Sequence, residues 1–123
     1  MGELNLKGLN ILVVEDEYLI ADDVNMALSG AGAVVLGPAP TVDAATRIIA
    51  DAAVIDGALL DINLAGDMVF DVADVLTARQ VPFAFATGYD RGSIPERFAS
   101  VPRLEKPIKA QQLGTLLGTL TGR

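Results

Sequence analysis

Residues 9–17 read LNILVVEDE, a short apolar run that ends abruptly in three acids. The run is rich in leucine and β-branched residues and predicts a strand that is buried on both faces. Buried strands of this kind are typical of parallel sheets, in which the chain returns through a helix before the next strand. The acids Glu15, Asp16 and Glu17 then follow the carboxyl end of the strand, which is where such sheets collect ligands.

The same pattern of strand followed by helix recurs along the rest of the chain. Gly88, Gly92 and Pro95 lower the helix propensity of residues 88–100, so we expect a short or mobile element there. Five strands that alternate with helices predict an α/β fold with a doubly wound five-stranded parallel sheet and helices on both faces. The further strands are expected at 33–36, 58–61, 82–86 and, as a weak edge strand, 103–105; the helices are expected at 20–31, 41–49, 69–80 and 113–120.

Composition narrows the function classes. The chain has 123 residues, 51% of them hydrophobic, which suits one domain over residues 1–123. The absence of cysteine and histidine excludes disulfides, thiol nucleophiles, the usual zinc sites and Ser-His catalytic pairs. A formal charge of −7 without a basic, aromatic cluster argues against direct DNA binding. No run approaches the ~20 apolar residues of a membrane span and no secretory signal is present, so we expect a cytoplasmic protein.

Five polar side chains fall at the carboxyl ends of the expected strands: Glu15, Asp16, Asp61, Thr87 and Lys106. Taken singly, each has an ordinary explanation, because an acid such as Asp16 or Glu17 can cap a helix and a lysine is usually solvated. Together they place three carboxylates at one edge of the sheet, where their repulsion requires a cation or bound protons. Oxygen ligands suit Mg²⁺, which binds carboxylates together with a phosphate oxygen. A carboxylate can itself be the nucleophile that accepts a phosphoryl group.

Four sequence blocks stand at these strand ends: Val14-Glu15-Asp16-Glu17, Leu60-Asp61-Ile62-Asn63-Leu64, Ala86-Thr87-Gly88 and Glu105-Lys106-Pro107. In order and spacing they resemble the signature blocks of two-component response-regulator receiver domains, and the resemblance covers about residues 8–121. It implies the flavodoxin-like receiver fold and a Lys106-Pro107 peptide bond in the cis form. It further implies that Asp61 is the phosphoacceptor, that Thr87 and Lys106 contact the phosphoryl oxygens, and that Mg²⁺ is held by Glu15, Asp16, Asp61 and the carbonyl oxygen of Asn63.

The chain departs from the common receiver pattern at two positions. Arg103 stands where the family commonly has an aromatic switch residue, three positions before the signature lysine. Residues 82–89, PFAFATGY, instead resemble a mainly alphaproteobacterial subfamily with a Phe-Ala-Thr-Gly-Tyr motif, which makes Thr87, Tyr89 and Arg103 the candidate switch residues. Ala65 replaces a common proline in the loop after the acceptor, a change that we expect to be tolerated.

The resemblance implies a single-domain receiver that takes a phosphoryl group from a sensor histidine kinase or a histidine phosphotransfer protein. Such a domain catalyses its own phosphorylation and dephosphorylation and is not otherwise an enzyme. Because three residues follow the last helix, we expect no output domain and an effect exerted on an unknown downstream protein or by onward phosphate transfer. The apolar stripe from Leu113 to Leu120 is expected in the core, although it could also extend into a homodimer surface. Two alternatives stay open: a metal-dependent phosphatase with an aspartyl nucleophile, and a degenerate receiver that only binds partners.

Overall fold

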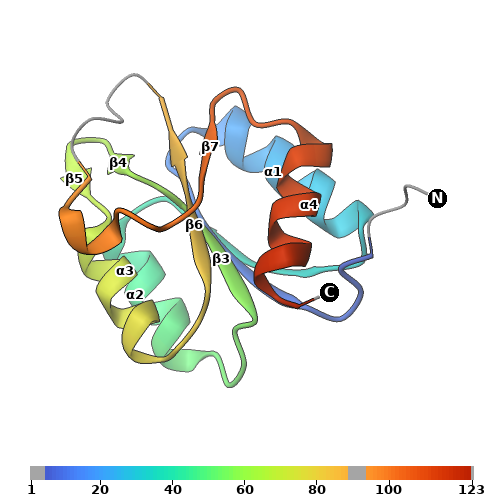
Figure 1. Ribbon diagram of the computed structural model, residues 1–123, viewed down its shortest axis with the longest axis horizontal. Helices are drawn as coiled ribbons and strands as arrows, with labels where there is room; N and C mark the ends of the chain where they lie inside the picture. Colours follow the sequence, from blue (N-terminus) through green and yellow to red (C-terminus); the bar gives the residue numbers. More distant parts are fainter. Residues whose placement is uncertain (1–4, 89–93, 123) are drawn as a thin grey trace.

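A five-stranded parallel sheet forms the centre of the computed structural model, which describes residues 5–88 and 94–122 (Figure 1). Its strand order is β2-β1-β3-β6-β7, so β1 and β3 flank the point at which the winding of the chain reverses. The expected fold class and all five expected strands are confirmed. The strands are β1 (Asn10–Val14), β2 (Val34–Ala39), β3 (Gly57–Asp61), β6 (Phe83–Thr87) and β7 (Arg103–Glu105).

Two helices cover each face of the sheet, and the two pairs lie on opposite sides of it in Figure 1. On one face α1 and α4 bury an aliphatic core, and on the other α2 and α3 bury a core that includes phenylalanines. The helices are α1 (Tyr18–Gly30), α2 (Val42–Asp51), α3 (Phe70–Ala78) and α4 (Ala110–Leu120). The expected stripe on the last helix packs inward, with Leu113 and Leu117 fully buried. Within the described part of the chain, none of the helices has the length and apolar character needed to cross a bilayer.

Local structure at the ends of the helices and in the loops has several specific features. The Thr41 hydroxyl accepts a hydrogen bond from the Ala44 N–H at 3.0 Å and caps α2. The first helix ends at Gly30, one residue before the end expected at residue 31, and the Lys106-Pro107 peptide bond is cis, as the resemblance implies. In the glycine- and proline-containing segment, the described residues form only a 3₁₀ turn, η2 (Glu96–Phe98). Glu17 stands at the N-cap of α1, but its side chain makes no capping hydrogen bond.

A small hairpin after Asp61 was not expected from the sequence. Its strands are β4 (Asn63–Leu64) and β5 (Asp67–Met68), joined by a two-residue turn. Both turn residues have positive φ, 52° at Ala65 and 100° at Gly66, as the twist of a tight hairpin requires. The Asn63 side-chain oxygen accepts a hydrogen bond from the Gly66 N–H at 2.8 Å. Proline, whose φ is fixed near −65°, cannot occupy position 65 in this turn.

All four phenylalanines of the chain pack together on the face covered by α2 and α3. The ring of Phe98 in η2 stacks on Phe70 at a centroid distance of 5.8 Å and meets the edge of Phe85 in β6 at 5.7 Å. Next to it, the Arg97 guanidinium donates two hydrogen bonds of 3.0 Å to the Asp74 carboxylate of α3. These contacts attach η2 to α3.

Candidate phosphoacceptor site

The carboxyl ends of four parallel strands bring the expected site residues to one edge of the sheet. Asp61 and Thr87 are the last residues of β3 and β6, Glu15 directly follows β1, and Lys106 directly follows β7. A cavity of about 300 Å³ opens at this edge. It is lined by Asp16, Glu17, Asp61, Ile62, Asn63, Ala65, Gly66, Thr87, Gly88 and Lys106.

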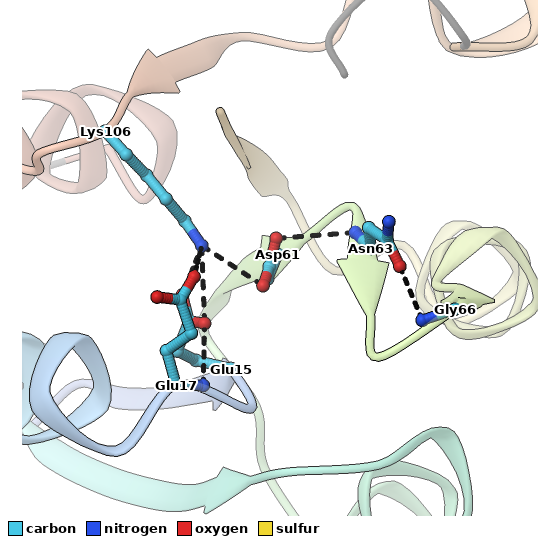
Figure 2. Close-up of polar contacts among 6 residues, drawn as sticks. All are labelled: Glu15, Glu17, Asp61, Asn63, Gly66 and Lys106. Carbon is cyan, nitrogen blue, oxygen red and sulfur yellow. Dashed lines mark hydrogen bonds and ion pairs between the residues drawn. The ribbon is translucent and has the colours of Figure 1, made fainter. Parts of the chain in front are cut away.

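The Lys106 ammonium lies at the centre of the site, as Figure 2 shows. It lies 3.1 Å from a carboxylate oxygen of Glu15 and 3.1 Å from Asp61 Oδ2. A third carboxylate oxygen, from Glu17, lies 3.2 Å away. Burial alone lowers the pKa of the ammonium, but the charges of Asp61 and Glu15 outweigh burial and hold that pKa above its ordinary value. Lys106 therefore stays charged near neutral pH.

The two buried acids, Glu15 and Asp61, are hydrogen-bonded to each other. Burial, together with this hydrogen bond and the charge of Asp61, raises the pKa of Glu15 from 4.5 to about 7. Burial also raises the pKa of Asp61, whereas the hydrogen bond with Glu15 and the charge of Lys106 lower it. Burial thus raises the pKa of both acids, and the charge of Lys106 favours the ionised form of each.

The site also fits a divalent cation. Oxygen atoms of four acids, Glu15, Asp16, Glu17 and Asp61, all lie within 4.8 Å of one another. Carboxylate oxygens are hard ligands, and Mg²⁺ prefers them to nitrogen or sulfur. One charged lysine offsets only part of the negative charge, so a cation would relieve the remaining repulsion. Sequence reasoning treated Glu17 only as a possible helix cap, and its place in the site depends on a contact with a residue 89 positions away.

A buried hydroxyl faces the same cavity without a partner. Thr87 is 2% exposed, and among the described residues its Oγ1 atom is the one buried side-chain oxygen or nitrogen that makes no hydrogen bond. A buried hydroxyl without a partner costs free energy, so such groups usually serve a ligand or a second conformation. Thr87 is therefore placed to donate a hydrogen bond to a group that enters the cavity.

The remaining candidate site residues are Asn63, Arg103 and Tyr89, and they do not lie together. The Asn63 backbone N–H lies 3.4 Å from Asp61 Oδ1, and its side chain holds the hairpin turn, so position 63 places an amide beside the acceptor (Figure 2). Arg103 is exposed on β7, where its guanidinium donates to the Ala99 carbonyl oxygen at 3.4 Å. Tyr89, the third candidate switch residue, lies outside the described residues.

Comparison with solved structures gives close matches over nearly the whole chain. SdrG from Sphingomonas melonis Fr1 is 38% identical, with a TM-score of 0.81 over 92% of this chain and 96% of that one. The receiver domain of the response regulator PhyR from Erythrobacter litoralis is 29% identical, with a TM-score of 0.78 over 94% of this chain and 91% of that one. A response regulator receiver protein from Sinorhizobium medicae WSM419 is 25% identical, with a TM-score of 0.79 over 96% and 98% of the two chains.

Among curated proteins, the phyllosphere-induced regulator PhyR of Methylorubrum extorquens is 39% identical over 97 residues, which are 77% of this chain. The match spans about a third of that relative, 34% of its length. No protein-family model matches the chain. The fold, the strand-end residues and the 38% identity to SdrG over nearly all of both chains agree, and the chain belongs to the receiver domains of two-component response regulators.

Proposed function

We propose that the chain is a phosphoacceptor switch and that Asp61 receives the phosphoryl group. One observation carries this proposal: a buried carboxylate at the end of β3 shares a cavity with a charged lysine 3.1 Å away and with an unpaired buried hydroxyl. The lysine and the hydroxyl are the donors that a phosphoryl group requires. The phosphoryl donor would be a sensor histidine kinase or a histidine phosphotransfer protein.

The reaction is a transfer between two nucleophiles. An oxygen of the ionised Asp61 carboxylate forms a bond to phosphorus, while the bond between phosphorus and the donor's imidazole nitrogen breaks. The electron pair of the broken bond stays on the imidazole nitrogen. Water later attacks the aspartyl phosphate, which releases inorganic phosphate and restores Asp61. Because both steps occur on its own side chain, the domain acts on itself and not on a separate substrate.

The surrounding residues would stabilise the transferred group. Lys106 donates to one phosphoryl oxygen and the Thr87 hydroxyl to another, which satisfies the hydroxyl left unpaired in the described structure. Glu15, Asp16 and Asp61, with the carbonyl oxygen of Asn63, would hold Mg²⁺. The bound cation would neutralise charge that develops on the phosphoryl oxygens.

Intact-mass measurement with acetyl phosphate and Mg²⁺ tests the proposal. The wild type is expected to gain one phosphate, and Asp61→Asn is expected to gain none while keeping its fold and an equal or higher melting temperature. Asp67→Asn, at an exposed acid in β5, is the matched control and should be phosphorylated like the wild type. Wild-type phosphorylation of Asp61→Asn, with the phosphate mapped to another residue, would refute the acceptor assignment.

The same measurement separates the alternatives. A metal-dependent phosphatase would turn over the donor without limit, but such enzymes usually carry a second acid two residues after the nucleophile, where this chain has Asn63. Asn63 is an amide whose side-chain oxygen holds the hairpin turn, so position 63 does not supply that acid. A degenerate receiver would form no adduct, and the assembled site residues argue against it.

The output would pass through binding to another protein or through onward phosphate transfer. A PhyR from Bartonella quintana, 25% identical and described as an anti-anti-sigma factor, supports output by protein binding. The chain spans about half of that relative, 49% of its length. A pull-down with and without beryllofluoride as phosphoryl mimic is expected to enrich a downstream protein only with the mimic. Size-exclusion chromatography under the same conditions tests for the homodimer.

A further inference from the structure

The three N–H donors of Lys106 are matched by three carboxylates in the unphosphorylated protein. The ammonium contacts both carboxylate oxygens of Glu15, at 3.1 and 3.3 Å, Asp61 at 3.1 Å and Glu17 at 3.2 Å (Figure 2). An ammonium has no further donor to offer. For Lys106 to contact a phosphoryl oxygen, one of these carboxylates must give up its contact.

The three carboxylates differ greatly in the free energy that is lost when Lys106 leaves them. The Glu15 and Asp61 side chains are 3% and 8% exposed, so losing the lysine before the transfer would leave a buried acid without its cation. The Glu17 side chain is 61% exposed, and water replaces the lysine there at little cost. The ion pair between Glu17 and Lys106 is therefore the first of these contacts to break.

The local structure directs the Glu17 side chain toward Lys106. Glu17 is the N-cap of α1, and its own N–H donates to Glu15 Oε2 at 3.1 Å, which fixes its backbone beside the buried acid. Its carboxylate makes no capping hydrogen bond to the helix and instead contacts Lys106, 89 residues away in sequence. The contact thus joins the loop after β1 to the loop after β7, and both residues line the cavity.

We propose that Glu17 is a positioning residue that restrains Lys106 in the resting protein and releases it to the incoming phosphoryl group. This inference rests on the proposed phosphoacceptor function and adds a regulatory contact to the same site. It predicts that the contact slows phosphorylation, since Lys106 must leave Glu17 before it can stabilise the transferred group. The free energy of one exposed ion pair corresponds to a change of about threefold in the rate of phosphorylation.

The decisive variant is Glu17→Asp, which keeps the charge but shortens the side chain by one methylene group. Its initial rate of phosphorylation by acetyl phosphate, measured by intact mass at about 0.15 M salt to screen distant charges, is expected to rise about threefold over the wild type. Asp22→Asn, which removes an exposed acid one turn further along α1, is the control and should react at the wild-type rate.

A double-mutant cycle tests whether Glu17 acts through Lys106. Lys106→Met is expected to slow phosphorylation, and adding Glu17→Asp should then leave that slower rate unchanged. The inference would be overturned if Glu17→Asp still accelerated phosphorylation without the lysine. It would also be overturned if Glu17→Asp reacted no faster than the wild type, or if Glu17→Gln reacted faster and Glu17→Asp did not. If the wild type itself gains no phosphate on Asp61, the proposed function falls as well; if it does and Glu17→Asp has no effect, only the inference falls.

Discussion

The backbone N–H of Lys106 donates a hydrogen bond of 2.8 Å to the carbonyl oxygen of Thr87. This bond continues the β6–β7 ladder beyond the pairing of Thr87 with Glu105. It fixes the spacing between the two residues whose side chains carry the hydroxyl and the ammonium of the site. A shift of Thr87 toward a phosphoryl group would therefore also displace the loop that begins at Lys106.

Thr87→Val is expected to stabilise the unphosphorylated protein, because it replaces a buried hydroxyl that has no described partner with a methyl group. The expected gain in the free energy of unfolding is about 1 kcal/mol, measured by urea denaturation without Mg²⁺. The same variant should weaken any response to beryllofluoride, because the proposed donor to the phosphoryl oxygen is gone. Thr87→Ser keeps the hydroxyl and should retain the response. A Thr87→Val variant that is less stable yet fully responsive would contradict both expectations.

Mg²⁺ is expected to stabilise the protein without phosphate, since it binds only the assembled acids and relieves their repulsion. A concentration about ten times the dissociation constant would add about 1.4 kcal/mol, seen as a higher melting temperature. Asp16→Ala should weaken this effect, whereas Asp23→Asn, on the exposed side of α1, should leave it intact. A melting temperature that millimolar Mg²⁺ does not move would show that the metal site is wrongly assigned.

Without metal, stability should fall as the pH rises. The pKa of Glu15 is about 7 in the folded protein against 4.5 as its ordinary value, so the folded state binds a proton that the unfolded chain has released between these values. The stabilisation is complete below pH 4.5 and is lost as the pH rises through 7, with a loss on the order of 3 kcal/mol. Urea denaturation from pH 5 to 8 in EDTA measures it. Glu15→Gln should show a flatter profile, and parallel profiles for the two proteins would contradict this origin.

Ala65→Gly should stabilise the protein by about 1 kcal/mol, because alanine pays a steric cost at φ 52° that glycine avoids. The same substitution at Ala50, inside α2, should instead cost about 1 kcal/mol. Ala65→Pro should destabilise the hairpin, since the proline ring excludes a positive φ. Thermal melts of the three variants rank their stabilities. A stabilised Ala65→Pro would show that the turn differs from the one described.

The sequence was sufficient to predict the layered fold and five of the polar groups at the edge of the sheet. The reason is that each buried strand is a short apolar run, and residues such as Asp61 and Lys106 stand where those runs end. The hairpin after Asp61 could not be predicted, because strands of two residues have no periodicity and alanine does not indicate a left-handed turn. The role of Glu17 depends on the approach of Lys106 across the folded sheet, which no local pattern encodes.

The phenylalanines are confined to one of the two cores, so their effect on proton NMR shifts can report on the packing of that core. All four phenylalanine rings lie in the core beneath α2 and α3, and the core beneath α1 and α4 contains no aromatic ring among the described residues. The phenylalanine ring currents therefore act on the core beneath α2 and α3, and methyl groups of Val72 and Leu76 are expected to be among those shifted. A one-dimensional proton spectrum can thus follow the packing of Phe98, and with it the attachment of η2, without isotope labelling.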